Sequence, residues 1–333
     1  MITAFAAKEP KASLMRFEYD PGELASDQVE IDVNFCGVSR RDIDMIDNSN
    51  ERSHYPLVPG HEIIGRIAKV GHSASRFYVD QIVGLGWQAG CCHQCDACLC
   101  GQQHLCLSVQ PTIINHHGGF AERVRGQESS VIALPSALDL ESACPFMSAG
   151  ISVFYPLVEF GIKPIDKVAV IGFGGLGHLA VQFLHAWGCE VNVFTSDMRK
   201  KSDAIAMGAD AVFNSIKPSN IALLTNQFDF ILSTVNVQLD WNSYLKALKP
   251  GGRLHFLANN VDAIDINVSA LVQGQKTLSG SSDGSPVLIG KMLRFAQLHD
   301  IKPVIEKYSF DNINQAISRL RNGQVRYRLV LCR

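Results

Sequence analysis

The chain has 333 residues, of which 47% are hydrophobic and 19% charged, a composition typical of a globular protein with a sizeable core. This length predicts two domains, at roughly 100–200 residues each. The net charge of −2 argues against a nucleic-acid partner, and no run of about 18 apolar residues is present that would cross a membrane. Residues 1–8 lack the pattern of a signal peptide, and the ten cysteines cluster instead of forming a spread disulfide framework, so we expect a cytoplasmic protein.

The N-terminal part of the chain, residues 1–149, predicts a β-rich region. Runs of alternating hydrophobicity, such as 29–33 and 82–85, are separated there by Gly, Pro and Asp turns. The pattern changes to a helical period around residues 151–160. Beyond it we predict strands at 167–171, 190–195, 229–234 and 253–257, and helices at 176–187, 200–207 and 241–248. This alternation is typical of an α/β domain with a parallel sheet and helices on both faces.

The last part of the chain, after residue 284, returns to a different pattern. We predict a helix at 286–298 and two short strands, near Val304 and at 328–331. No internal repeat and no low-complexity linker separates these segments.

Four cysteines in the β-rich region have the spacing of a metal site. They are Cys92, Cys95, Cys98 and Cys106. The two-residue gaps let thiolates fold back on one ion, and the longer gap brings the fourth around to complete a tetrahedron. Four thiolates leave no open position, so the spacing predicts one structural zinc per chain; a set of reduced or redox thiols is the alternative.

A glycine-rich turn follows the strand at 167–171 and precedes a helix. It reads Gly172-Phe173-Gly174-Gly175-Leu176-Gly177. In this context the first glycine allows the tight turn, the second allows a pyrophosphate to approach the backbone, and the third allows the helix to pack on the strand. We therefore predict a dinucleotide-binding loop, with a purely structural glycine turn as the alternative.

The end of the next strand indicates which dinucleotide is bound. NAD enzymes place an acid there to hold the ribose 2′-hydroxyl, whereas this chain has Thr195 and Ser196. These hydroxyls, with Lys200 nearby, suit a 2′-phosphate and predict NADP. Asp197 keeps NAD open as an alternative. We also assign Thr234 and Val235, at the end of the strand at 229–234, to the cofactor site.

These motifs, together with the stretch Val-Pro-Gly-His-Glu-Ile-Ile-Gly at 58–65, resemble the medium-chain zinc alcohol dehydrogenases over essentially the whole chain. The resemblance is greatest to the cinnamyl alcohol dehydrogenase branch and, within it, to bacterial NADPH-dependent broad-specificity aldehyde reductases. It implies a GroES-like catalytic domain from residues 1–149 and 284–333, with a zinc lobe at 91–106, and an inserted Rossmann domain at 150–283. It also implies a homodimer and a role for Arg40 in holding the cofactor pyrophosphate.

The chain departs from this family where the catalytic zinc is expected. When the motifs are aligned on Asp42, the two cysteine ligands are replaced by Ser39 and Ser148, and the proton-relaying hydroxyl is replaced by Arg41. The third ligand, His61, is retained. A neutral hydroxyl is a poor zinc ligand, and a fixed cation repels the ion.

Three hypotheses follow. In the first, the protein reduces an aldehyde, quinone or enone, or oxidises an alcohol, without a catalytic zinc. Arg41, or protonated His61 oriented by Asp42, then stabilises the developing negative charge. In the second, the protein is a non-catalytic NADP-binding module. In the third, a weakened zinc is held by water and by His61, Glu62 or Asp42.

Overall fold

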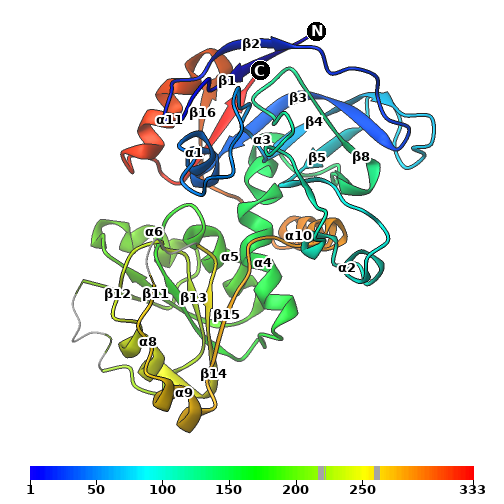
Figure 1. Ribbon diagram of the computed structural model, residues 1–333. Helices are drawn as coiled ribbons and strands as arrows, with labels where there is room; N and C mark the ends of the chain where they lie inside the picture. Colours follow the sequence, from blue (N-terminus) through cyan, green and yellow to red (C-terminus); the bar gives the residue numbers. More distant parts are fainter. Residues whose placement is uncertain (217–220, 222, 259–262) are drawn as a thin grey trace. The chain divides into compact units, whose positions relative to one another are not determined.

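The computed structural model describes residues 1–216, 221, 223–258 and 263–333, which form two compact units (Figure 1). Residues 1–151 and 283–333 make the first unit, and residues 152–282 make the second. The chain therefore leaves the first unit, builds the second, and returns to the first. No helix among these residues is long and apolar enough to cross a bilayer.

The first unit is built on an antiparallel-rich sheet of order β16-β17-β3-β4-β5-β9, with β8 also pairing with β3. Its strands are β3 (Gln28–Val38), β4 (Ile63–Val70), β5 (Ile82–Leu85), β8 (Arg123–Gln127), β9 (Val131–Ala133), β16 (Ile305–Ser309) and β17 (Arg328–Cys332). Smaller ribbons join β1 (Ile2–Ala6) to β2 (Met15–Tyr19), and β6 (Gln88–Gly90) to β7 (Gln110–Pro111). The unit's helices are α1 (Arg40–Ile46), α2 (Asp96–Leu99), α3 (Leu140–Ala143), α10 (Pro286–Leu298) and α11 (Ile313–Arg321). Buried Ile, Val and Leu side chains from β3, β4, β5 and β17 form the core.

The second unit contains a sheet of order β12-β11-β10-β13-β14-β15, with every neighbouring pair parallel. Its strands are β10 (Lys167–Ile171), β11 (Glu190–Thr195), β12 (Ala211–Asn214), β13 (Phe228–Ser233), β14 (Leu248–Phe256) and β15 (Thr277–Gly280). Its helices are α5 (Gly177–Trp187), α6 (Lys201–Ala206), α8 (Trp241–Ala247) and α9 (Val268–Gly274), and α4 (Ala149–Glu159) contains the boundary with the first unit. Numbered from β10, the strand order is 3-2-1-4-5-6, the Rossmann order.

The prediction of an α/β chain with a β-rich part and a parallel-sheet part is confirmed. Several elements were not predicted: β12, β15, α9 and α11. The two strands are short edge strands with half-buried side chains, so they lack the apolar run of the central strands. The helix predicted at 200–207 is shorter, because a 3-10 turn at Met198–Lys200 precedes α6, and the strand near Val304 begins one residue later, at Ile305.

Candidate active site, cofactor loop and zinc lobe

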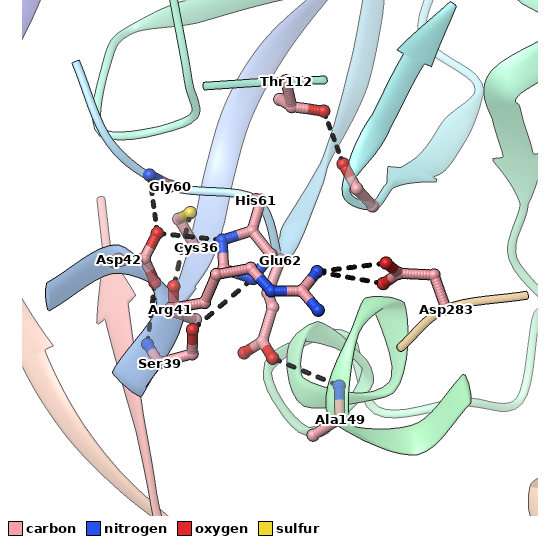
Figure 2. A network of polar contacts seen from close by, with 12 residues as sticks. Cys36, Ser39, Arg41, Asp42, Gly60, His61, Glu62, Thr112, Ala149 and Asp283 are labelled. Atoms are coloured by element: carbon pink, nitrogen blue, oxygen red, sulfur yellow. Dashed lines mark hydrogen bonds and ion pairs between the residues drawn. The ribbon is translucent and has the colours of Figure 1, made fainter. Parts of the chain in front are cut away.

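A buried chain of polar groups joins Ser39, His61 and Asp42 in the first unit (Figure 2). Ser39 follows β3 and is the N-cap of α1, on which Asp42 lies, and His61 lies just before β4. The Ser39 Oγ atom lies 3.4 Å from His61 Nε2, and His61 Nδ1 lies 2.9 Å from Asp42 Oδ1. His61 and Asp42 have no exposed surface and Ser39 is 7% exposed, so the structure places these three predicted residues together.

The Asp42 carboxylate accepts hydrogen bonds from three N–H groups. Besides His61, the backbone N–H of Ser39 donates to Oδ2 at 2.8 Å and that of Gly60 donates to Oδ1 at 3.0 Å. Burial opposes ionisation of Asp42, but the charge of His61 and these hydrogen bonds outweigh it and lower the pKa of Asp42 below its usual value. Because an ionised carboxylate only accepts hydrogen bonds, the proton lies on His61 Nδ1, and Nε2 faces the Ser39 hydroxyl.

Glu62 lies beside His61 in sequence and is fully buried, but its carboxylate is paired elsewhere. Both of its oxygens form an ion pair with the Arg328 guanidinium of β17, and the backbone N–H of Ala149 donates to Oε1 at 3.3 Å. Burial raises the pKa of Glu62, and Arg328 opposes that shift. A Cβ at Gly37 would lie 2.1 Å from Glu62 Oε2, so glycine is required there. Glu62 therefore links the start of β4 to α4 and β17.

Arg41 is held in place on two sides. Its Nη1 donates to both oxygens of Asp283, at 3.0 and 3.2 Å (Figure 2). Its guanidinium carbon lies 4.5 Å from the centre of the Trp87 ring. The ring of His61 meets the same indole edge-on, with centroids 5.4 Å apart. The Arg41 side chain is 29% exposed. The arrangement fixes a cation and an aromatic face beside His61.

The side chains at this site do not fit a tightly held zinc ion. The positions aligned with the family's two thiolates carry the hydroxyls of Ser39 and Ser148, the latter buried at the end of the short helix Cys144–Met147. Asp42 is engaged by His61 and backbone N–H groups, and Glu62 is engaged by Arg328. Thiolate and imidazole are the donors that zinc prefers, and only the imidazole remains.

The four cysteines of the predicted zinc lobe do fit that ion. Their Sγ atoms all lie within 4.8 Å of one another, and in the described residues no other group of three or more His, Cys, Asp or Glu side chains could share an ion. The Sγ atom of Cys92 lies 3.5 Å from that of Cys106 and 3.9 Å from that of Cys98. A tetrahedron with Zn–S bonds of about 2.3 Å has edges of about 3.8 Å. Hydrogen bonds, chiefly from backbone N–H groups, lower the pKa of Cys92 to about 6, whereas the pKa values of Cys95 and Cys98 are raised to about 11. One thiolate is therefore favoured without the metal, and metal binding would release protons from the other thiols.

The glycine loop lies between β10 and α5 in the second unit. Gly172 has φ +93° and packs against Val235 and Thr234, where a Cβ would lie 2.4 and 2.7 Å from their side chains. A Cβ at Gly177 would lie 2.0 Å from the Gly172 carbonyl oxygen, whereas one at Gly174 would meet nothing within 4 Å. The open backbone at Gly174 is the space that a pyrophosphate needs. Gly175 is half-buried, and Leu176 is the N-cap of α5.

Other residues of the second unit that we assigned to the cofactor lie close to this loop. Thr234 donates its hydroxyl to the Ile171 carbonyl at 2.9 Å, and Lys200 Nζ donates to the Phe173 carbonyl at 3.3 Å. Thr195 is buried and Ser196 is exposed at the end of β11. Arg40, which is also assigned to the cofactor, belongs to the first unit, where it pairs with Asp44 one turn along α1 at 3.1 Å.

Comparison with known proteins agrees with this architecture. Residues 25–136 match the alcohol dehydrogenase GroES-like domain, and residues 175–297 match the zinc-binding dehydrogenase family. The chain is 50% identical to aldehyde reductase AdhA of Synechocystis sp., over 99% of this chain and 98% of that protein. Its structure resembles a cinnamyl alcohol dehydrogenase of Sorghum bicolor, with a TM-score of 0.96 and 30% identity over 99% and 97% of the two chains. The Helicobacter pylori enzyme CAD, solved with NADP(H), has a TM-score of 0.90 and 28% identity, with the same coverage.

The chain therefore belongs to the medium-chain zinc alcohol dehydrogenase family. Within the family it is similar to aldehyde reductases and cinnamyl alcohol dehydrogenases, and it is an oxidoreductase, as predicted. The predicted GroES-like and Rossmann folds are likewise confirmed. The four-cysteine cluster fits the predicted structural zinc.

Sequence reasoning did not find two charged residues of the site. Asp283 and Arg328 pair with side chains that lie 242 and 266 residues away in the chain. Arg328 lies in a stretch that resembles the family, 326–331, but nothing local indicates its partner. Trp87 carried a weak signal, because it follows two closely spaced glycines at a strand end.

Proposed function

We propose that this protein catalyses the NADPH-dependent reduction of an aldehyde, or of an activated substrate such as a quinone or enone, without a zinc ion at the reacting carbonyl. The observation that carries the proposal is the buried Ser39–His61–Asp42 chain. In the alignment with the family, its hydroxyl and imidazole correspond to a thiolate ligand and a zinc-binding imidazole. An alcohol is the substrate in the reverse direction.

The choice of NADP is supported by the end of β11 and by the relatives. Thr195 and Ser196 supply hydroxyls and Lys200 supplies a cation beside the glycine loop, and all three suit a 2′-phosphate. The Helicobacter pylori relative was solved with NADP(H). The bound cofactor supplies the hydride, so the protein has to supply a proton and stabilise negative charge on the substrate oxygen.

The proton reaches the substrate oxygen through Ser39 in this proposal. When His61 is protonated on both nitrogens, Nε2–H donates to Ser39 Oγ, 3.4 Å away. The Ser39 hydroxyl can then give its own proton to the alkoxide oxygen while it takes one from His61. Asp42 stabilises the imidazolium and holds the ring in this orientation, as the acid of a Ser-His-Asp triad does. His61 is left neutral after the alcohol has formed.

Arg41 has a second role in the proposal, as an electrostatic stabiliser. Asp283 and Trp87 restrain the guanidinium, so it needs little reorganisation when charge develops nearby. The same fixed cation disfavours a divalent ion at this position. Trp87 would form an aromatic wall for the substrate, and Ser148 has no chemical role in this proposal.

We further propose a cytoplasmic homodimer. None of the ten cysteines, all of which lie in the described residues, forms a disulfide, which is typical of proteins in a reducing compartment. The dimer follows the family resemblance and is tested by analytical ultracentrifugation of the purified protein.

The test is an NADPH-oxidation assay against aldehydes, quinones and enones, combined with zinc counting. We expect turnover that survives a mild chelator with about one zinc per chain, the ion of the closed four-thiolate lobe. The variants H61N and S39A should lower kcat by about 10²-fold, as expected for loss of a general acid. A zinc content of about two per chain, with activity lost in step with the second ion, would overturn the zinc-free mechanism. Failure to oxidise NADPH with every substrate would overturn the proposed activity.

A further inference from the structure

Asp197 brings a negative charge to the proposed NADP site. A carboxylate near the end of the second strand is the feature by which NAD enzymes hold the ribose 2′-hydroxyl, and it repels a 2′-phosphate. Asp197 comes directly after Ser196, and its backbone N–H donates to Thr195 Oγ1 at 3.2 Å. The acid is therefore fixed beside the hydroxyls that suit the phosphate.

The Arg199 guanidinium pairs with both oxygens of the Asp197 carboxylate. Its Nε donates to Oδ1 of Asp197 at 2.8 Å, and its Nη2 donates to Oδ2 at 2.9 Å. The backbone N–H of Arg199 also donates to Oδ1, at 3.1 Å. This is a bidentate pair in which two parallel N–H groups meet two oxygens. The hydrogen bonds from Arg199 lower the pKa of Asp197 to about 2, so the carboxylate stays ionised and its charge is matched by the guanidinium.

The pair lies next to the dinucleotide loop. Phe194 pairs with Ile171 in the β10–β11 register, and the N–H of Gly172 donates to the Phe194 carbonyl at 2.8 Å. Lys200, the residue after Arg199, reaches back to the Phe173 carbonyl inside the loop. In a Rossmann sheet this edge receives the adenosine ribose, so a charge on Asp197 acts on the 2′ position.

We propose that Arg199 determines the preference for a 2′-phosphorylated cofactor by neutralising Asp197. The inference rests on the NADP dependence proposed above and adds a residue that sets its strength. Asp197 anchors the guanidinium, so it does not act as the acid that selects NAD. The side chain of Arg199 is 91% exposed, and its removal leaves the core of the unit untouched.

The test compares the binding of adenosine 2′,5′-bisphosphate and of AMP to the full-length protein by calorimetry. These ligands differ only in the 2′-phosphate. In R199A we expect the affinity for the bisphosphate to fall about tenfold, or about 1.4 kcal/mol, and that for AMP to change less than about twofold. The matched control is K201A, which removes an exposed charge of the same sign two residues further along the chain and should leave the ratio of the two affinities near the wild-type value.

A double variant separates neutralisation from direct contact. If Arg199 acts through Asp197, D197S/R199A should bind the bisphosphate within about threefold of the wild type, because both charges are gone. A double variant as weak as R199A would mean that Arg199 contacts the phosphate itself, and would overturn the inference, as would an R199A protein indistinguishable from the wild type. A wild-type protein that binds AMP as tightly as the bisphosphate would refute the proposed NADP dependence and this inference together.

Discussion

Changing Ser39 and Ser148 to cysteine and Arg41 to serine is expected to create a second zinc site. A tetrahedral zinc with Zn–S of about 2.3 Å and Zn–N of about 2.0–2.1 Å separates sulfur and nitrogen by about 3.6 Å. The Ser39 Oγ to His61 Nε2 distance is 3.4 Å, so this edge of the tetrahedron is already close to the required length. The site lacks thiolate donors, while the spacing of this one edge is retained.

The expected gain in zinc affinity is large. Loss of an outer partner of a metal ligand costs about 10–100-fold in affinity, so restoring two direct ligands should raise affinity by more than about 10². The purified triple variant would be dialysed against dilute zinc with a weak chelator and its metal measured by mass spectrometry. We expect about two zinc ions per chain, against about one in the wild type, where only the closed four-cysteine site binds.

Two controls make this result specific. H61N in the triple background should return the content to about one zinc, since three protein ligands are needed at a catalytic site. R41S alone should also stay at about one, because it restores no donor. A triple variant that remains at about one zinc while folding normally would refute the alignment of Ser39 and Ser148 with the ligand positions.

The remaining predictions concern the loop, a buried ion pair and a buried histidine. G174A should fold normally, because its Cβ meets only open space in the free protein, but that Cβ would occupy the space of the pyrophosphate and lower NADPH affinity by at least about tenfold. G177A should lower the melting temperature, because its Cβ would lie 2.0 Å from a carbonyl oxygen. R328M should cost about 3–5 kcal/mol in the free energy of unfolding, measured with urea, because it leaves Glu62 buried and unpaired. His255 is held between two serine hydroxyls and burial lowers its pKa to about 4. Below pH of about 6.5 the unfolded chain binds a proton that the folded chain does not, so about 3 kcal/mol of stability should be lost between pH 6.5 and 4 in pH-dependent melts.

Each of these expectations has a contrasting variant. Adding E62Q to R328M should recover part of the lost stability, and an R328M protein as stable as the wild type would show that the pair is not buried as described. H255N should flatten the pH dependence between pH 6.5 and 4, and an unchanged slope would assign the titration to another group. If NADPH binds G174A normally, the pyrophosphate does not approach the backbone at that residue.

The predictable parts of the molecule are those encoded by local spacing. The glycine loop and the four cysteines each lie within a short segment, so their chemistry can be inferred before any tertiary contact is known. The alternating apolar strands of the parallel sheet are equally local, whereas β12 and β15 escaped prediction because edge strands bury less.

The active-site environment could be predicted only in part. Ser39, Asp42 and His61 were found by alignment with a family motif, and the structure brings their side chains together. Asp283 restrains Arg41, and Arg328 restrains Glu62. Each of these pairs joins residues that lie more than two hundred positions apart in the sequence. No periodicity or spacing encodes such a pair, so the charge balance of the site emerges only from the fold.

The position of β17 has a consequence for how the protein is made. Residues 328–332 insert between β16 and β3 in the first unit, whereas residues 152–282 of the second unit are contiguous. On the ribosome the second unit can therefore complete its sheet first, although domains usually fold in order from the N-terminus. Until the final segment emerges, Glu62 has no Arg328 to pair with. A nascent chain that stops before residue 328 would carry a finished nucleotide-binding unit and an open β-sheet, which is a substrate for chaperones and proteases.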